Sequence, residues 1–324
     1  MERLEANARD LEQAAEILRT GGLVAFPTET VYGLGARADD PRAVRRIFEA
    51  KGRPSDHPLI VHLARRDWLP SWTSEVSAEA SVLAERFWPG PLTLILPRRE
   101  SVPDVVTGGQ PTIGLRVPRH PVALDLLDRV GVGLAAPSAN RFGHVSATTA
   151  DHVEHDFGET IDAIVDGGPC AVGLESSIVD LSGEEPRLLR PGAVLRGELE
   201  DALGRPLGEP THTAPRVPGA LASHYSPKTP LALVEGNQLP REVEESVGTL
   251  CVLSAAHPDP SSSRLSWIEM PTDPHGYARA LYDTLRRADR ARADRILVAL
   301  PGSGPEWSPI LDRLTRAAHV GETD

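Results

Sequence analysis

The sequence predicts an α/β protein with two domains, and three observations support this. Helix and strand patterns are mixed over the first two hundred residues without strict alternation, which favours a twisted, mixed sheet with flanking helices. A window from 205 to 230 then holds six prolines and few apolar residues. After it, strands and helices alternate, which predicts a small three-layer unit with a parallel sheet. A chain of 324 residues is long enough for both.

Composition excludes several classes of protein. The longest apolar runs, such as 92–96, are far shorter than the ~20 residues of a membrane span. The N-terminus has charges of both signs and no apolar segment, which argues against a secretory signal. The two cysteines, Cys170 and Cys251, exclude a disulfide framework and favour a reducing compartment, so we expect a cytoplasmic protein. A net charge of −12 argues against a general nucleic-acid binder.

The elements of the first domain follow from apolar spacing and from capping residues. Asp40 as N-cap and Pro41 as first helical residue predict a helix that ends at Gly52. The other predicted helices cover about 11–20, 77–87 and 121–130. The predicted strands are 23–27, 58–63, 92–96, 112–117, 132–136, 163–165, 177–181 and 187–189.

The remaining third of the chain divides into a linker and a second domain. Because of its prolines, 205–230 is predicted to be a semi-rigid linker or a loop laid over a surface. The domains expected are therefore 1–204 and 231–324. The second has predicted strands at 231–234, 249–254 and 295–300, and helices at about 240–246, 274–291 and 307–318.

Residues 42–66 form a basic segment in this acidic chain, with seven Lys/Arg against two acids. At the end of the second predicted helix, this segment contains Lys51, Gly52, Arg53 and Pro54. Lys is a compact point charge and Arg a planar fork, and both suit phosphate oxygens. The segment is compatible with an anion site or with a solvated helix face.

Two further motifs place polar groups next to buried strands. Ser138 and Asn140 follow the strand 132–136, where α/β folds hold ligands, although a turn with an Asn cap gives the same pattern. Residues 26–35 match neither a Walker loop nor a dinucleotide fingerprint. Their two threonines beside Glu29 form either a polar pocket or an ordinary strand.

The other motifs are weaker. His152 and His155 lie among acids, but no further Cys or His has a familiar metal-ligand spacing, so a polar helix surface is favoured and no protein-ligated metal is predicted. The glycines at 302 and 304 follow a strand but favour a structural turn. No nucleophile elbow, kinase set or protease signature occurs. An enzyme of this sequence would thus take its nucleophile from the substrate.

Together the motifs resemble the YrdC-like domain, and more closely the two-domain threonylcarbamoyl-AMP synthases. The resembling stretches, in family order, are FPTETVYGLG at 26–35, KGRPSDHPLIVH at 51–62, PGPLTLIL at 89–96, IGLRVP at 113–118, APSAN at 136–140, ESSIVD at 175–180, RPG at 190–192 and HYSP at 224–227. The resemblance implies a YrdC-like domain followed by a smaller Rossmann-like α/β domain. It also implies a nucleotidyltransferase that makes threonylcarbamoyl-AMP and pyrophosphate from L-threonine, bicarbonate and ATP, for threonylcarbamoyladenosine modification of tRNA. The implied partners include tRNA and the downstream threonylcarbamoyl transferase.

The resemblance also implies roles for individual residues. Lys51 and Arg53 would be catalytic, close to the phosphates. Threonine would be held by Thr30, His62, Arg116, Ala136 and Ser176. ATP would be held by Arg53, His57, Thr112, Ser138, Asn140, Ser146, Arg190 and Tyr225. Mg²⁺ would be held mainly through phosphate oxygens and water. Three positions depart from the family pattern: His57 replaces the usual Asn, Ser177 replaces the usual Thr, and 221–223 lacks the usual basic residue.

Two other functions fit parts of the pattern. A double-stranded RNA or tRNA-binding module without synthase activity would use the basic segment 42–66, although the net charge argues against it. A hydrogenase-type carbamoyl-transfer maturation factor would need Cys-rich fingers, which two cysteines cannot supply.

Overall fold

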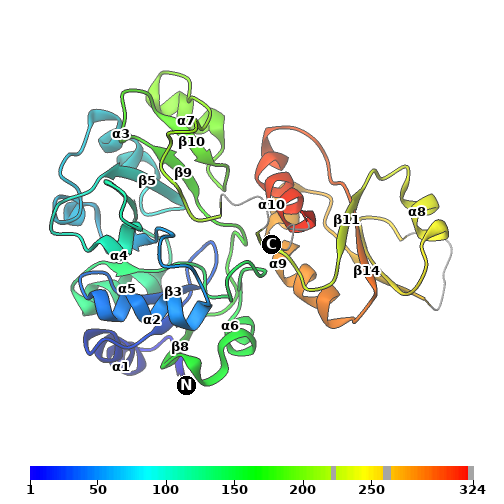
Figure 1. Ribbon diagram of the computed structural model, residues 1–324, viewed down its shortest axis with the longest axis horizontal. Helices are drawn as coiled ribbons and strands as arrows, with labels where there is room; N and C mark the ends of the chain where they lie inside the picture. The colour runs from blue at the N-terminus through cyan, green and yellow to red at the C-terminus, as the bar shows by residue number, and fades with distance from the viewer. Residues whose placement is uncertain (220–223, 258–263, 320–324) are drawn as a thin grey trace. The chain divides into compact units, whose positions relative to one another are not determined.

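The computed structural model describes residues 1–219, 224–257 and 264–319. These residues form two compact units, coloured by position in Figure 1. The first comprises Met1–Phe142, Ser146–Ala171 and Glu175–Ala220. The second comprises Gly143–Val145, Val172–Leu174 and Leu221–Asp324, within the described ranges. No helix among the described residues is long and apolar enough to cross a membrane.

The first unit is built on a ten-stranded mixed sheet, which confirms the predicted fold class. The strand order is β1-β8-β2-β3-β7-β4-β6-β5-β9-β10. The strands are β1 (Glu2–Glu5), β2 (Val24–Phe26), β3 (Gly33–Arg37), β4 (Ile60–His62), β5 (Leu92–Pro97), β6 (Thr112–Arg116), β7 (Leu134–Ala135), β8 (Ala163–Asp166), β9 (Ser177–Asp180) and β10 (Arg187–Arg190). The strand predicted at 132–136 is reduced to the two residues of β7, although the flanking Gly133 carbonyl and Ala136 N–H still hydrogen-bond to Ala38 and Ile60.

Helices cover this sheet, and their ends follow the capping residues. They are α1 (Ala8–Arg19), α2 (Pro41–Lys51), η1 (Arg66–Ser71), α3 (Ala78–Phe87), α4 (Asp104–Thr107), α5 (Pro121–Val130), α6 (Ala150–Phe157), η2 (Gly158–Thr160) and α7 (Arg196–Leu203). In α2, the Asp40 side chain accepts from the Arg42 N–H, and Gly52 ends the helix with φ 64°. That left-handed conformation favours glycine, as predicted.

The Pro-rich segment begins on the first unit. Val217 joins an apolar cluster with Ile60 and Ile95, and Ala214 packs against it. The Arg216 N–H donates to Gln110 Oε1 (2.7 Å), and Gln110 Nε2 donates back to the Arg216 carbonyl (3.1 Å). Up to residue 219 the segment is therefore a loop laid over a surface, one of the two predicted alternatives. Residues 220–223, including the departure from the family pattern at 221–223, lie outside the described residues.

The second unit has a four-stranded, fully parallel sheet in the order β11-β14-β12-β13. Its elements are β11 (Leu231–Val234), α8 (Leu239–Glu245), β12 (Leu250–Ser254), β13 (Leu265–Glu269), α9 (Pro274–Arg290), β14 (Arg295–Ala299), η3 (Pro305–Trp307) and α10 (Ser308–Ala318). The predicted parallel sheet is confirmed. The sequence pattern missed β13, whose side chains are exposed or only half-buried.

Candidate active site

The first part of the site lies at the carboxyl ends of two neighbouring strands. β4 and β6 run parallel, and His62 pairs in register with Arg116 at the last position of each. Both side chains are buried, with 4% of each residue exposed. Burial and the Arg116 charge lower the pKa of His62 to about 3, so this imidazole is neutral at pH 7. Carboxyl ends of parallel strands are where α/β folds place ligands.

Three contacts fix the Arg116 guanidinium. Its Nη2 donates to Thr30 Oγ1 (3.0 Å) and lies 2.7 Å from Glu29 Oε1, while Nε donates to the Gly90 carbonyl (3.3 Å). In the described part of the chain, Nη1 has no partner. The Thr28 and Thr30 hydroxyls lie 2.9 Å apart. Residues 28–30 therefore form a buried polar cluster rather than a strand, since β2 ends at Phe26 and β3 starts only at Gly33.

Ser176 and Arg190 form the next part. Ser176 Oγ lies 2.8 Å from Thr93 Oγ1. Arg190 Nη2 donates to the Ser176 carbonyl (2.8 Å) and to its hydroxyl (3.1 Å). Ser146 Oγ donates to Glu175 Oε1 (2.6 Å), which places a buried carboxylate directly before Ser176. A residue expected to bind nucleotide, Arg190, thus contacts one expected to bind threonine, Ser176.

Lys51 provides a buried cation at the end of α2. Its ammonium donates to the Ser138 carbonyl (2.6 Å) and, over a shorter distance, to the Asn140 carbonyl. Only 3% of the residue is exposed. Burial, together with the nearby Arg53 and Arg141 charges, lowers the pKa of Lys51 well below its ordinary value. Two carbonyl dipoles partly offset the free-energy cost of burying this ammonium group. Among the described residues, no carboxylate lies within ion-pair distance of it.

Phe142 gathers two more of the expected residues. The Arg53 guanidinium lies 5.5 Å from the centre of its ring, and Arg53 Nη2 also donates to the Pro58 carbonyl (3.0 Å). The His57 ring meets the same phenyl ring edge-on, with 5.3 Å between centres. Burial, with the Arg53 charge, lowers the pKa of His57. Arg53 and His57 therefore share one aromatic support.

The 137–140 loop connects the two parts of the site. The Ala139 N–H donates to the Tyr32 carbonyl (2.7 Å), and the Leu34 N–H donates to the Pro137 carbonyl (2.8 Å). Ser138 also forms an isolated bridge with Gly33. The loop that supports Lys51 therefore lies alongside the segment that carries Thr30. The structure brings together the cations and hydroxyls that the sequence placed far apart.

Three further residues that were expected to bind substrates, Ala136, Thr112 and Tyr225, lie in different parts of the structure. Ala136 is buried, and its N–H donates to the Ile60 carbonyl (3.0 Å), beside β4. Thr112 begins the strand that Arg116 ends, so roughly 13 Å of strand separates them. Tyr225 belongs to the second unit, where its ring stacks on Tyr282 with 5.7 Å between centres. A contact between Tyr225 and a nucleotide stays a prediction.

Comparisons with known proteins agree with this geometry. A family model described as "Telomere recombination" (Sua5_yciO_yrdC) matches residues 16–192, and one described as "Threonylcarbamoyl-AMP synthase, C-terminal domain" (Sua5_C) matches 194–319. A threonylcarbamoyl-AMP synthase of Bacillus subtilis is 40% identical, with 97% of this chain and 94% of the relative covered. One of Pyrococcus abyssi is 48% identical, with 72% and 71% covered. The chain belongs to the threonylcarbamoyl-AMP synthase family.

Solved structures extend the similarity to the fold. Sua5 of P. abyssi complexed with L-threonine has a TM-score of 0.90 at 38% identity, covering 98% of this chain and 97% of that one. YciO of E. coli has a TM-score of 0.51 at 26% identity, covering 59% and 95%. HypF, at 18% identity, shares the fold alone. As a member of this family, the chain is an enzyme of the nucleotidyltransferase type.

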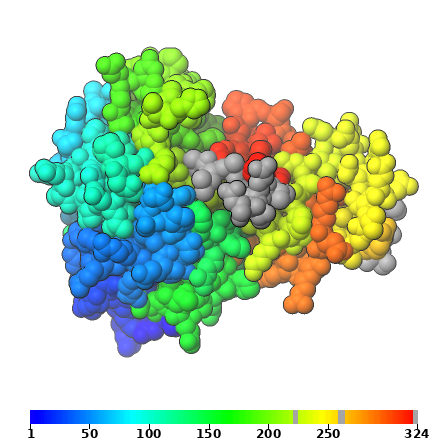
Figure 2. All heavy atoms as spheres, viewed as in Figure 1, coloured from blue at the N-terminus to red at the C-terminus, as the bar shows by residue number. Residues whose placement is uncertain are grey.

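The basic segment of this family member divides into two sets. Lys51 and Arg53 are buried, whereas Arg42, Arg45, Arg65 and Arg66 are exposed. The atoms of α2, blue in Figure 1, lie on the face that Figure 2 presents. The solvated-face interpretation therefore holds for the exposed arginines, and an anion site at Lys51 and Arg53 stays a prediction. The exposed arginines form a solvated face, whereas the Lys51 and Arg53 side chains are buried.

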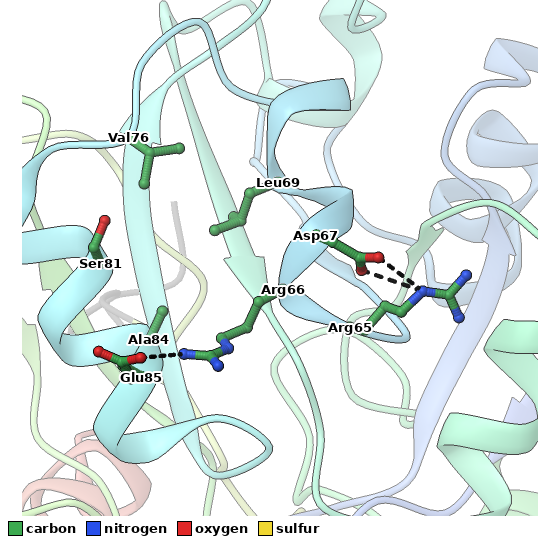
Figure 3. A pocket seen from close by; sticks show the side chains of 8 residues that line it. All are labelled: Arg65, Arg66, Asp67, Leu69, Val76, Ser81, Ala84 and Glu85. Atoms are coloured by element: carbon green, nitrogen blue, oxygen red, sulfur yellow. Dashed lines mark hydrogen bonds and ion pairs between the residues drawn. The ribbon is translucent and has the colours of Figure 1, made fainter.

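The groove in Figure 3 is separate from this site. It has a volume of about 550 Å³ and is lined by Arg65, Arg66, Asp67, Leu69, Val76, Ser81, Ala84 and Glu85. None of the expected site residues lines it. Its two arginines are paired with carboxylates, Arg65 with Asp67 (3.2 Å) and Arg66 with Glu85 (3.7 Å). The groove therefore offers little uncompensated positive charge.

The residue-by-residue expectations omitted several members of the cluster. Glu29, Thr93, Phe142 and Glu175 all contact expected site residues, yet none was assigned a role. Glu29 and Glu175 had a sequence signal, because each lies within a motif of small polar residues. Thr93 and Phe142 had none, since an apolar strand and an isolated phenylalanine are common core features.

Proposed function

We propose that this enzyme makes threonylcarbamoyl-AMP and pyrophosphate from L-threonine, bicarbonate and ATP. The observation that carries the proposal is a chain of contacts between two buried cations. Lys51 is held by the 137–140 loop, this loop hydrogen-bonds to Tyr32 and Leu34, and nearby Thr30 contacts Arg116. The names of relatives that match nearly the whole chain support the same reaction, as does the threonine in the P. abyssi structure.

The proposed chemistry needs no protein nucleophile. The threonine amine adds to the carbon of bicarbonate, a C–N bond forms, and water leaves to give a carbamate. A carbamate oxygen then attacks the α-phosphorus of ATP, and the bond to the β-phosphate oxygen breaks with release of pyrophosphate. The protein aligns the reactants and stabilises the charge that develops on the phosphates.

At the amino-acid end, Arg116 would bind the threonine carboxylate. Two of its nitrogens already have protein partners, so Nη1 is the nitrogen left to meet a ligand. The neutral His62 would hydrogen-bond the substrate without adding charge. The proposed threonine contacts are Thr30, His62, Arg116, Ala136 and Ser176.

At the nucleotide end, Lys51 and Arg53 would stabilise the phosphates in the transition state. Lys51 has carbonyl partners and no carboxylate in ion-pair contact among the described residues, so a bound phosphate would supply the negative charge that favours its protonated form. The proposed ATP contacts are Arg53, His57, Thr112, Ser138, Asn140, Ser146, Arg190 and Tyr225. Mg²⁺ would enter with ATP and stay on phosphate oxygens and water, because it is hard and strongly hydrated.

The proposal extends to the cellular setting. The product would serve threonylcarbamoyladenosine formation on tRNA, through a downstream threonylcarbamoyl transferase in the cytoplasm. Residues 1–204 would form the catalytic domain, 205–230 the linker and 231–324 the C-terminal domain.

Pyrophosphate release tests the function directly. With ATP and bicarbonate present, release should depend on threonine and should be much weaker with serine or with no amino acid. Removal of bicarbonate should abolish it. Equal release of pyrophosphate with threonine, with serine and without an amino acid would contradict the proposal.

The RNA-binding alternative is not favoured. Several arginines of the basic segment are paired with carboxylates, among them half-buried Arg46 with Asp162 (2.9 Å) and exposed Arg66 with Glu85 (3.7 Å). Pairing reduces the charge available to phosphate backbones. A steep fall of tRNA affinity with salt would instead support such a surface.

A further inference from the structure

Glu29 is a buried acid to which the proposed reaction gives no role. Only 4% of the residue is exposed. Its Oε1 forms the ion pair with Arg116, in which both side chains are 5% exposed. Both carboxylate oxygens are buried and have no hydrogen-bond partner among the described residues, so Oε1 has only the ion pair and Oε2 has neither kind of contact.

Such an arrangement is unfavourable unless it serves a purpose. Burial of a carboxylate costs several kcal/mol even after relaxation, and good ion pairs also satisfy the remaining lone pairs. Here one carboxylate oxygen and one guanidinium nitrogen, Nη1 of Arg116, are both left without a protein partner in the described residues. Each member of this buried ion pair therefore has one atom with unused hydrogen-bonding capacity.

We propose that Glu29 binds the α-ammonium group of the amino-acid substrate while Arg116 binds its carboxylate. A free α-amino acid is a zwitterion, and the pair Glu29 and Arg116 supplies both complementary charges at one place. Thr30, which Arg116 Nη2 also contacts, lies directly beside Glu29 in the chain. This inference rests on the proposed function, because it assumes that the site takes an amino acid.

The assignment also explains how the nitrogen is oriented for the next step. A carbamate nitrogen keeps one N–H, which the Glu29 carboxylate can still accept after the amine has reacted. The carboxylate thus holds the nitrogen from one side, and the new carbamate oxygens are directed away from it. Glu29 would be a specificity-determining residue that distinguishes an amino acid from the corresponding hydroxy acid.

Calorimetric titration of the full chain tests this assignment. The probes are L-threonine and the dihydroxy acid in which a hydroxyl replaces the ammonium. Wild-type protein should prefer threonine by about 10- to 100-fold, the range of a buried charge-assisted hydrogen bond. Glu29→Gln, which keeps the shape but removes the charge, should lose most of this preference, and Glu29→Asp should retain it. Asp180→Asn, a buried acid at the far end of β9, is the matched control and should keep the wild-type preference.

Two outcomes would overturn the assignment. One is a wild-type protein that binds the dihydroxy acid as tightly as threonine, which needs no variant and so does not depend on folding of Glu29→Gln. The other is a folded Glu29→Gln protein that keeps the full preference. Pyrophosphate release reports separately on the proposed function, because a wild-type protein could prefer threonine and still release none.

Discussion

The two ends of the candidate site hold their buried cations in different ways. At the proposed amino-acid end, Arg116 lies 2.7 Å from the Glu29 carboxylate, so the pair has no net charge. At the proposed nucleotide end, the Lys51 side chain donates to the carbonyls of Ser138 and Asn140, which are dipoles. The Arg116 charge is therefore balanced by a carboxylate, whereas Lys51 has only dipoles as partners and its burial lowers its pKa.

This difference matches the charges of the proposed substrates. A zwitterion is neutral overall, and an ion pair with open valences complements it without net charge. A triphosphate is strongly anionic, and a cation held only by dipoles keeps its attraction for phosphate. The partners of the two buried basic side chains, a carboxylate for Arg116 and carbonyl groups for Lys51, would thus suit each of them to a different substrate.

Removal of the Lys51 charge should have the largest effect on this comparison. Lys51→Ala should lower turnover in pyrophosphate release by roughly 10²–10³-fold, as expected for loss of one charge-stabilising donor. Threonine affinity should stay near the wild-type value, because the amino-acid end is intact. Arg45→Ala, exposed on the same helix, is the control and should be fully active. A Lys51→Ala enzyme with wild-type turnover would contradict the role.

Arg116→Lys should affect the opposite end. One ammonium cannot hold Glu29, Thr30 and a ligand carboxylate as a planar fork does. We expect the KM for threonine to rise about 10- to 100-fold, with a much smaller change in the KM for ATP. Arg98→Lys, which follows the neighbouring strand β5, should change neither constant. A change confined to the KM for ATP would show that the two ends have been assigned the wrong way round.

His62 predicts a dependence of stability on pH. Its pKa is about 3 in the folded protein and about 6.5 when unfolded, so the unfolded state binds the proton first as the pH falls. The free energy of unfolding should therefore decrease below pH 6.5, by about 2 kcal/mol at pH 5 from this residue. Urea unfolding of His62→Gln should lack that component, whereas exposed His155→Gln should retain it. Identical pH profiles for wild type and His62→Gln would disprove it.

Ser138→Ala should have the smallest effect. Lys51 contacts the carbonyl of Ser138 and not its hydroxyl, so the substitution leaves the Lys51 support in place. Loss of one hydrogen bond to ATP should raise the KM for ATP by about fivefold, with turnover nearly unchanged. A 100-fold fall in turnover would instead show that the loop itself, rather than the hydroxyl, had been disturbed.

Sequence patterns located most elements that have caps or apolar stripes. Asp40, Pro41 and Gly52 bound α2 as predicted, because these residues act through their own backbone. β3 was missed, since Gly33 and Gly35 do not have the side chains of a typical strand. A Cβ at Gly35 would lie 2.7 Å from the Phe26 ring, so this strand needs glycine for a reason that only its neighbour reveals. β1 was missed because it is short and mostly charged.

The sequence predicted which residue types belong to the candidate site, but not which of these residues contact one another. The sequence determined that Thr28, Glu29 and Thr30 are adjacent, that Lys51 ends a helix, and that Ser138 follows a strand. These are local properties of the chain, set by order and backbone preference. Only the tertiary structure decided that Arg116 meets Glu29 and that Lys51 meets carbonyls, because each contact joins segments that are far apart in the sequence. The effective charge of a buried cation depends on those distant partners, and no local pattern contains them.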